Sequence, residues 1–431
     1  MPLLLDLVYG LLALVLGGPY LLYRRLTRGP GSVPLREYFG RVPARPVSAD
    51  CVWIHAVSLG EVNATRTIVA ELHQRSPDTV VVISSTTQTG RDRARALYPN
   101  LVTFRYPLDF SWVVRQTLTR VRPSVIVLME LEVWPNLIEL ATARDIPVII
   151  ANGRITAERS VRRFNHPAVR WLARRMFRKL RWVGVQDGTY RARFVELGVE
   201  PERVEITGSV KYDAADVSDH IEGQDELAQA MGIIVTRPLW VCGSTGPGEE
   251  AMILEAYAKL NAQFPDLQLA IIPRKPERFD EVAQLIVQRG YACLRRSTGA
   301  PLLPAGVTEP RPVFLGDTMG ELRKFYALAT LVFVGRSLVP MGGSDVMEAA
   351  GLARAILVGP HTGNFAEAVN LLISEGACRR LSGPDGLAPA VSDLLRHPDR
   401  RKQMGTAGRA AILSRRGATT RTVDQILALL P

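Results

Sequence analysis

Cysteine is scarce in this chain. The 431 residues include only four, Cys51, Cys242, Cys293 and Cys378, and no two have the spacing of a metal site or a redox pair. Cys51 and Cys242 flank or lie in strand-like apolar runs, where a free thiol packs as a small hydrophobic group. This pattern excludes a disulfide-stapled scaffold, and we expect a reducing compartment.

Several nucleotide and metal signatures are also missing. The sequence has no Asp-x-Asp triplet to hold a divalent ion. Its glycine-rich turn at residues 243–250 lacks both the Gly-Lys-Ser/Thr ending of a P-loop and the spacing of a dinucleotide fingerprint. We therefore expect no metal site and no required cofactor, with activity retained in EDTA.

The composition favours a large folded protein with anionic partners. Hydrophobic residues make up 47% of the chain, which supports sizeable cores, and the length is that of two to three domains. The formal net charge is +11. Such a basic excess is typical of proteins that meet nucleic acid, phosphate-bearing substrates or an anionic membrane face.

An apolar run at residues 3–23 predicts a membrane anchor. It is about long enough to span a bilayer, and Arg24, Arg25 and Arg28 follow it at once, which places the rest of the chain on the cytoplasmic side. A cleaved signal peptide is disfavoured because no charge precedes the run and no small-residue cleavage site follows it. Asp6 and the Gly-Gly-Pro kink at 17–19 leave open a segment lying in the membrane interface.

After the anchor, strand-like and helix-like patterns alternate, which predicts parallel sheets covered by helices on both faces. A polar break near residues 213–237 divides the alternation into two sets. The strand-like runs lie at 52–56, 80–84, 102–106, 125–129, 148–151, 182–185 and 204–206, and then at 239–242, 269–272, 313–315, 331–334 and 355–358.

The pattern therefore predicts an α/β protein with two doubly wound, Rossmann-like domains that face a cleft. Its expected parts are an anchor at 1–27, a linker at 28–50, domains at 51–225 and 226–410, and a C-terminal helix at 411–431 that packs back on the first domain.

Glu61 is the leading candidate for a catalytic residue in the first domain. It follows the apolar run at 51–55 through a short turn, so it lies at the carboxyl end of a predicted strand, where open α/β sheets bind ligands. A carboxylate there is suited to act as a general base. The alternative is an acid that only complements the dipole of the helix it begins.

Two further charged sites follow other strands of this domain. Glu130 and Glu132 come after the run at 125–129 and would point to the same side if the strand continued. Lys211 follows the run at 204–206 and is suited to meet a phosphate or carboxylate. Helix-dipole acids and a solvated surface lysine are the alternatives.

Glycine-rich turns recur at the strand ends of the second domain and favour a nucleotide cleft. Arg274 is suited to pair with a phosphate, Ser344 or Asp345 to cap a helix, and Glu348 to accept ribose hydroxyls. The turns lie at residues 243–250, 316–321, 335–351 and 359–365.

A basic segment runs from Arg154 to Arg181. Ten Lys or Arg residues and one Glu alternate there with Phe164, Trp171 and Phe177. With the apolar N-terminus, this favours an anionic membrane surface over nucleic acid or a merely solvated face.

Seven stretches together resemble the lipid A Kdo (3-deoxy-D-manno-octulosonic acid) transferase family. Residues 55–61 resemble H-[SA]-V-S-x-G-E, 130–136 E-T-E-x-W-P-N, 152–160 N-A-R-x-S-x-R-S, 208–213 G-[NS]-x-K-[FY]-D, 273–279 P-R-H-P-E-R-F, 316–322 G-D-T-M-G-E-L and 359–365 G-P-H-T-x-N-F. In this order, the matches span nearly the whole chain.

The resemblance implies a B-type glycosyltransferase fold. It implies an inner-membrane enzyme of lipopolysaccharide synthesis that transfers Kdo from CMP-Kdo, with inversion, to the 6′-hydroxyl of a lipid A precursor. By position, Glu61 is the general base, and Glu130 and Lys211 support the transition state. The residues implied to contact CMP are Pro273, Arg274, Met319, Gly320, Glu321, Asp345, Val346, Met347 and Glu348.

Departures from the family motifs leave the donor open. Ser344 and Asp345 stand where the family often has His-Asn, and Gly246 stands where its S-T-H-E-G-E-E motif has His. A transferase or epimerase of the same fold acting on a UDP-sugar is therefore an alternative. A non-enzymatic membrane or nucleic-acid binding protein on the same scaffold is a third hypothesis.

Overall fold

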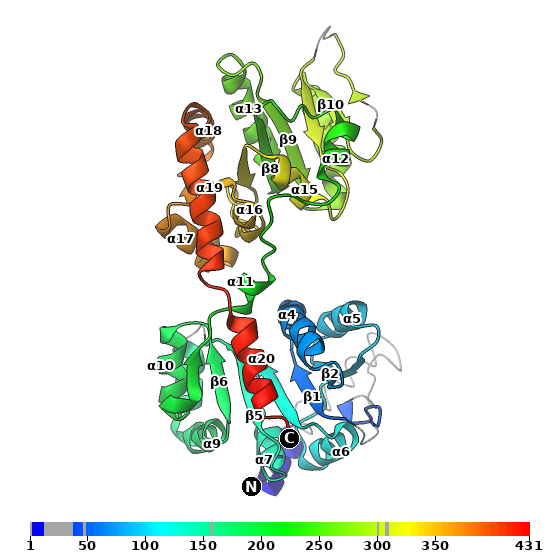
Figure 1. Ribbon diagram of the computed structural model, residues 1–431, viewed down its shortest axis with the longest axis vertical. Coiled ribbons are helices and arrows are strands. Elements are labelled where there is room, and N and C mark those ends of the chain that lie inside the picture. The colour runs from blue at the N-terminus through cyan, green and yellow to red at the C-terminus, as the bar shows by residue number, and fades with distance from the viewer. Residues whose placement is uncertain (1, 13–37, 46–48, 156–157, 300, 307–309) are drawn as a thin grey trace. The chain divides into compact units, whose positions relative to one another are not determined.

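The computed structural model describes residues 2–12, 38–45, 49–155, 158–299, 301–306 and 310–431. The chain forms two compact units (Figure 1). Unit 1 comprises Met1–Ala214 and Arg415–Pro431, and unit 2 comprises Ala215–Ser414. The division falls inside the predicted polar break but before residue 225, and the chain returns to unit 1 at Arg415 rather than at 411. The cleft expected between the domains stays a prediction.

Unit 1 contains a seven-stranded sheet in the order β3-β2-β1-β4-β5-β6-β7. All of its pairings are parallel. The strands are β1 Cys51–His55, β2 Val80–Ser85, β3 Val102–Arg105, β4 Val125–Met129, β5 Val148–Gly153, β6 Trp182–Val185 and β7 Val204–Ile206.

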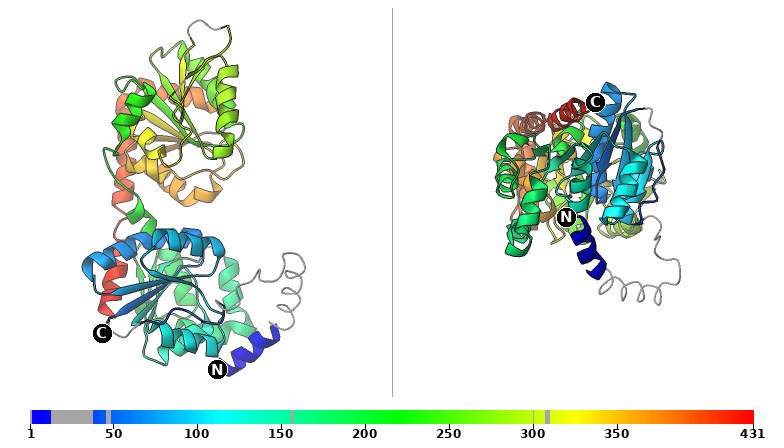
Figure 2. Two further views of the ribbon diagram at one scale, coloured as in Figure 1. Left: turned by 90° about the vertical axis from the view of Figure 1, so that its right-hand side faces the viewer. Right: turned by 90° about the horizontal axis from the view of Figure 1, so that it is seen from below.

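The helices of unit 1 cover both faces of this sheet, so successive side chains of a strand enter two different cores (Figure 2). In β1, Trp53 joins one core, whereas Val52 and Ile54 join the other. The helices are α1 Pro2–Leu12, α4 Leu59–Arg75, α5 Gln88–Leu97, α6 Ser111–Val121, α7 Pro135–Thr142, α8 Glu158–Asn165, α9 Pro167–Phe177, α10 Gly188–Glu196, η2 Pro201–Arg203, α11 Val210–Ala214 and α20 Ala418–Ala428.

Unit 2 contains an eight-stranded sheet in the order β11-β10-β12-β9-β8-β13-β14-β15. It is parallel except for the β10–β11 pair. The strands are β8 Leu239–Thr245, β9 Gln268–Pro273, β10 Ala292–Arg295, β11 Pro301–Leu302, β12 Pro312–Leu315, β13 Leu331–Val334, β14 Ala355–Val358 and β15 Cys378–Arg380.

The helices of unit 2 enclose a core that includes the fully buried Trp240, Tyr257 and Phe333. They are α12 Gln224–Met231, α13 Glu249–Asn261, η3 Pro276–Arg278, α14 Phe279–Gln288, α15 Leu322–Leu328, α16 Met347–Gly351, η4 Gly363–Phe365, α17 Ala366–Ser374, η5 Pro384–Gly386, α18 Leu387–Arg396 and α19 Pro398–Leu413.

The two predicted parallel α/β domains are confirmed, but the pattern missed three strands of unit 2. These are β10, β11 and β15, which are short strands at or near the sheet edges and carry polar or exposed residues. The helix expected at 411–431 is interrupted: α19 ends at Leu413, and α20 begins at Ala418 after Gly417, which takes a left-handed φ of 107°.

The predicted anchor is described only as far as α1. Residues 13–27 and most of the linker lie outside the described part. Among the described residues, no helix has both the length and the apolar character needed to cross a membrane. Asp6 of α1 accepts hydrogen bonds from Ser111 N at 2.7 Å and Asn136 Nδ2 at 3.2 Å, so α1 is attached to α6 and α7.

Candidate active site

The strand order of unit 1 places its candidate acids at one location. The chain proceeds from β1 outward to β2 and β3, then returns to β4 on the other side of β1. This reversal is the topological switch point, and ligands of open α/β sheets bind outside the carboxyl ends of the strands there. Glu61 follows β1 and Glu130 follows β4. The structure therefore brings these two predicted residues to the same edge.

The Glu61 carboxylate is held by the turn that precedes its helix. Ser58 is the N-cap of α4, and its Oγ accepts a hydrogen bond from Glu61 N at 3.3 Å. In return, Glu61 Oε1 accepts from Ser58 Oγ and Oε2 from Val57 N, both at 2.9 Å. This reciprocal capping box starts α4 at Leu59, so the helix-start reading of Glu61 is correct as geometry. It also fixes a half-buried carboxylate at the ligand edge.

The chain does not continue as a strand after Met129. Glu130 has a left-handed φ of 57° and its N–H donates to Ala151 O at 3.0 Å, so the backbone turns there. The condition under which Glu130 and Glu132 would point to one side, a strand that continues past Met129, is therefore not met. Burial, and then the nearby charge of Glu61, raises the pKa of Glu132 to about 7. The sequence motifs predict no separate role for Glu132.

An aromatic stack adjoins this edge. The ring centroids of His55 and Tyr106 are 4.1 Å apart, and those of Tyr106 and Trp134 are 5.3 Å apart. His55 is fully buried, and burial lowers its pKa to about 3, so its ring is neutral at pH 7. His55 Nε2 and the Tyr106 hydroxyl have no hydrogen-bond partner among the described residues. Within the described residues, they are unpaired polar groups beside the acids.

Lys211 lies on the same side of unit 1, on α11, which packs against α4. Asn152, with a left-handed φ of 56°, accepts a hydrogen bond from Val210 N at 3.3 Å and so holds the start of α11. The Lys211 side chain is exposed. Asp213, the last residue of the same motif, accepts from Gly417 N at 2.7 Å and Thr419 N at 2.6 Å and caps α20.

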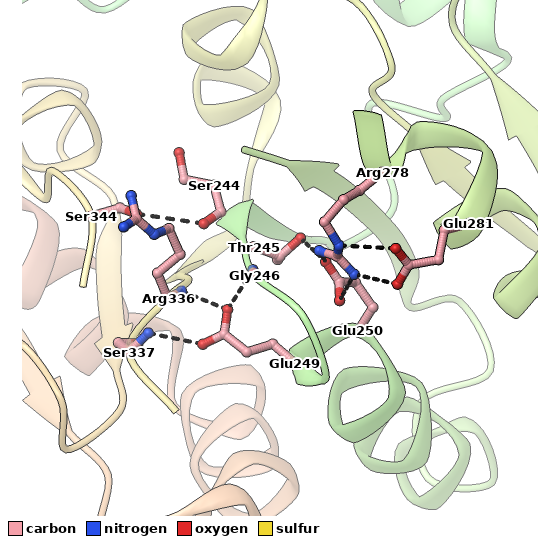
Figure 3. Close-up of polar contacts among 10 residues, drawn as sticks. All are labelled: Ser244, Thr245, Gly246, Glu249, Glu250, Arg278, Glu281, Arg336, Ser337 and Ser344. Carbon is pink, nitrogen blue, oxygen red and sulfur yellow. Dashed lines mark hydrogen bonds and ion pairs between the residues drawn. The ribbon is translucent and has the colours of Figure 1, made fainter. Parts of the chain in front are cut away.

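The switch point of unit 2 lies between β8 and β13, and a buried carboxylate joins their turns (Figure 3). Glu249 Oε2 accepts from Gly246 N at 2.8 Å, and Oε1 accepts from Ser337 N and Leu338 N, both at 2.8 Å. A glycine-rich turn at a helix start binds anions through free N–H groups. The Gly246 N–H is not free, because Glu249 accepts its hydrogen bond.

A second buried acid connects β8 to the turn after β9. Glu250 accepts from Arg278 Nη1 at 2.7 Å and Nη2 at 3.0 Å, and from Thr245 Oγ1 at 2.7 Å (Figure 3). Arg278 also pairs with Glu281 at 2.8 Å. Neither acid had an assigned role in the sequence analysis. The available signal was a pair of acids in the first helical turn after a glycine-rich segment.

Arg274, Asp345 and Glu348 form one electrostatic group. Burial, and then the charge of Asp345, raises the pKa of Glu348, while Arg323 and Arg274 act in the opposite direction. The buried Tyr326 hydroxyl also lies within the influence of Glu348 and Asp345 and has no partner among the described residues. The structure therefore brings together three of the residues predicted to contact CMP.

The start of the short helix α16 involves the predicted residue Asp345. Asp345 Oδ1 accepts a hydrogen bond from Met347 N at 2.9 Å, as expected for a cap, but α16 has only five residues. Val346, Met347 and Pro273 are buried, so these three side chains offer a ligand little besides backbone groups.

The 316–321 turn combines an exposed side chain with a paired acid. Met319 is 64% exposed, and Gly320 has a φ of 87°. Burial works to raise the pKa of Glu321, but hydrogen bonds, led by that from Arg296, lower it overall. Arg296 Nε and Lys324 Nζ lie 2.9 and 3.3 Å from its carboxylate. Glu321 thus stabilises the turn in which it lies.

The basic segment is less uniform than its sequence suggests. Arg175 and Lys179 both pair with Glu139, at 2.6 and 2.7 Å. Phe177 is buried in the core of unit 1, so it does not belong to a surface face as predicted. Trp171 is 64% exposed.

No cluster of three or more His, Cys, Asp or Glu side chains suited to a metal ion occurs in the described ranges.

The two Rossmann-like units form a two-domain α/β fold, with acids at the switch point of unit 1 and glycine-rich turns and arginines at that of unit 2. The UDP-GlcNAc 2-epimerase of Neisseria meningitidis, solved with UDP-GlcNAc, shares this fold. It aligns with a TM-score of 0.56 and 14% identity over 88% of this chain and 100% of that one. A likeness at this level concerns the fold alone.

Sequence relatives identify the family. Residues 34–214 match the family described as 3-Deoxy-D-manno-octulosonic-acid transferase (kdotransferase). The 3-deoxy-D-manno-octulosonic acid transferase of Haemophilus influenzae is 34% identical over 394 residues, covering 90% of this chain and 88% of that protein. The one of Bordetella pertussis is 36% identical over 427 residues and 94% of each chain. The chain belongs to this family and is a glycosyltransferase, which excludes the non-enzymatic hypothesis.

Proposed function

We propose that this enzyme transfers Kdo from CMP-Kdo to the 6′-hydroxyl of a lipid A precursor, with inversion at the anomeric carbon. The observation that carries the proposal is the meeting of Glu61, Glu130 and Glu132 at the unit 1 switch point in a chain of this family. A sugar hydroxyl needs a proton acceptor before it can attack, and carboxylates at a ligand edge provide one.

In this mechanism, Glu61 takes the proton of the acceptor hydroxyl. The hydroxyl oxygen bonds to the anomeric carbon of Kdo as the bond to the CMP phosphate breaks, and CMP leaves with the bonding electron pair. A single displacement from the opposite face inverts the centre. The hydrogen bonds from Ser58 and Val57 orient the Glu61 carboxylate. Lys211 and Arg274 are the cations suited to the leaving phosphate or the donor carboxylate, and Glu130 supports the acceptor side.

The test of the base is Glu61→Gln. Glutamine keeps a capping box but carries no charge, so we expect α4 to stay folded. Transfer from CMP-Kdo to a lipid A precursor should fall by roughly 10²–10⁴-fold, the usual cost of losing a general base. The measurement is product formation, together with thermal unfolding of both proteins.

Glu71→Gln is the matched control, because it makes the same chemical change on the same helix, where Glu71 pairs with Arg75 at 3.2 Å. It should leave transfer unchanged. Near-wild-type transfer by Glu61→Gln would refute the base assignment while leaving the overall reaction intact.

The alternative is a transferase or epimerase acting on a UDP-sugar. It is motivated by Asp345, an acid beside Glu348 that stands where the family motif has a neutral amide. Binding of CMP, UMP and UDP to the wild-type protein separates the two. Preference for CMP supports the Kdo donor, and preference for UDP would refute it. Retained activity in EDTA is expected for the Kdo reaction.

We further propose that the enzyme acts on the inner membrane from its cytoplasmic side. Exposed apolar side chains lie on α1, α9 and around the start of α6, which occupy one end of unit 1 with α7 (Figure 1). These side chains are Leu7 at 72%, Leu11 at 66%, Trp112 at 51% and Trp171 at 64% exposed. A lipid-linked acceptor would be reached from such a surface.

A further inference from the structure

Arg336, for which the sequence analysis gave no role, occupies an unusual position at the unit 2 switch point. It directly follows Gly335 at the end of β13, and its backbone φ is 58°. This left-handed conformation is uncommon for residues other than glycine, asparagine and aspartate. Ser244, near the end of the adjacent β8, has a similar φ of 55°. Such outliers persist where surrounding contacts hold them, often at ligand sites.

The contacts that hold Arg336 come from both sides of its backbone. Its N–H donates to Glu249 Oε2 at 2.5 Å (Figure 3). Its carbonyl accepts from Gly343 N at 2.7 Å. Glu249 is fully buried and also takes the N–H groups of the neighbouring turns. Because this carboxylate already accepts these N–H groups, they are not available to a ligand phosphate at this edge.

The Arg336 side chain passes over Gly246. A Cβ atom at position 246 would lie 3.1 Å from Cγ of Arg336 and 2.9 Å from Sδ of Met341, so glycine leaves room for both. The family motif has histidine at this position. In this chain, the aliphatic part of the Arg336 side chain, from the turn after β13, occupies the space beside the β8 turn.

The guanidinium of Arg336 has unused donors. Nη2 donates only weakly, to Met341 O at 3.4 Å, and the buried Nε has no partner in the described ranges. Arg278 at the next turn is the opposite case, because Glu250 and Glu281 bind its guanidinium fully. No acid among the described residues pairs with Arg336, so its charge is available to an anion.

We propose that Arg336 binds the phosphate of the nucleoside monophosphate part of the donor and determines donor affinity in this enzyme. The inference rests on the proposed function. Guanidinium groups bind phosphate through paired hydrogen bonds. Arg274, whose N–H donates to Thr245 O at 3.1 Å, borders the same β8 turn and supplies a second cation. Arg336 therefore raises the affinity of the donor site for a single phosphate.

The experiment is calorimetric titration of the full chain with CMP and with cytidine, which lacks the phosphate. In Arg336→Gln, the Kd for CMP should rise roughly 10- to 100-fold, the loss expected for charge-assisted hydrogen bonds, while the Kd for cytidine stays the same. Arg336→Lys should retain part of the preference for CMP, because lysine keeps the charge but cannot form the paired hydrogen bonds of a guanidinium.

Two further variants separate binding from structure. Arg336→Gly should weaken CMP as much as Arg336→Gln, with an unchanged or higher Tm, since glycine adopts a φ of 58° without strain. Arg289→Gln removes the same charge just after α14, where Arg289 pairs with Glu255 at 3.1 Å, and should leave CMP binding unchanged.

The outcomes distinguish this inference from the proposed function. If the wild-type protein binds CMP and the Gln and Gly variants bind it equally well, the role of Arg336 is overturned and the donor assignment stands. If the wild-type protein does not bind CMP, the donor assignment and this inference both fail.

Discussion

At the scale of single residues, the switch point of unit 1 holds two carboxyl groups, and the charge of one influences the pKa of the other. Glu61 is fixed by hydrogen bonds, whereas Glu132 is half-buried and its pKa is raised to about 7 by burial and by the charge of Glu61. Near neutral pH, Glu132 therefore changes charge while Glu61 is the candidate base. Ionisation of Glu132 adds a second negative charge at this edge, which favours movement of the acceptor's proton toward the carboxylates.

This coupling predicts the pH profile of Glu132→Gln. Wild-type kcat/KM should rise through about pH 7 as Glu132 loses its proton. The Gln variant mimics the protonated form at every pH, so its profile should lack the bend near 7 while keeping transfer activity. Steady-state rates from pH 5 to about 9 give the comparison. An unchanged bend in the variant would assign it to another group.

Asp109 illustrates a buried acid with a structural role. It is 6% exposed and accepts hydrogen bonds from Asn136 N and Leu137 N, both at 2.9 Å, at the start of α7. Burial is the largest effect on its pKa and, despite these hydrogen bonds, raises it from 3.8 to about 7.

The sign of the stability effect follows from the raised pKa. The folded state holds the proton of Asp109 more tightly than the unfolded state, so this stability is present below pH 3.8 and is lost as pH rises through about 7. Asp109→Asn, which cannot titrate, should destabilise the protein more at about pH 4 than at about pH 8. Thermal unfolding across that range is the measurement. Exposed Asp78→Asn should show no such trend, and a flat difference for Asp109→Asn would contradict the argument.

At the scale of elements, strands were easier to predict than their ends and connections. The apolar runs of β1 and β4 are buried on both faces, so their composition alone identifies them. The strands β10 and β15 were missed because half-exposed or charged edge positions need few apolar residues. The capping box that starts α4 and the left-handed turn at Glu130 depend on local hydrogen bonds rather than on periodicity.

The C-terminal helix α20 supplies an element-scale prediction. It packs against α4 and α11, and Asp213 caps it through Gly417 N and Thr419 N. Asp213→Ala leaves both N–H groups without their acceptor, which should cost about 1–2 kcal/mol. Hydrogen exchange of the α20 amides should accelerate accordingly.

Asp187→Ala is the control for this change. Asp187 caps α10 through Tyr190 N at 2.9 Å, so its loss should affect α10 and leave α20 protected. Unaltered exchange in α20 of Asp213→Ala would show that other contacts fix this helix.

At the scale of the whole molecule, the exposed apolar side chains of unit 1 predict binding to anionic membranes. Trp171 is 64% exposed on α9, in a chain with a formal charge of +11. Trp171→Ala should lower partitioning onto anionic vesicles several-fold, because an interfacial tryptophan is lost without any change in charge.

Val235→Ala is the control, since Val235 is 68% exposed in unit 2, outside the proposed membrane surface. Its vesicle binding should match that of the wild type. Equal partitioning by Trp171→Ala, measured by co-sedimentation at fixed salt, would remove α9 from the proposed membrane surface.

The sequence by itself determined the two parallel α/β domains and the order of the family motifs, because buried strands need apolar runs and motif residues stand at fixed intervals. Glu61 and Glu130 were placed at strand ends correctly. Only the tertiary structure decided that β1 and β4 are neighbours, which brings both acids to one edge. It also shows that Glu249 accepts N–H groups of the unit 2 turns, and that the Arg336 guanidinium keeps a donor without a partner among the described residues. Contacts between residues distant in the chain arise from strand order and packing, and no local pattern records them.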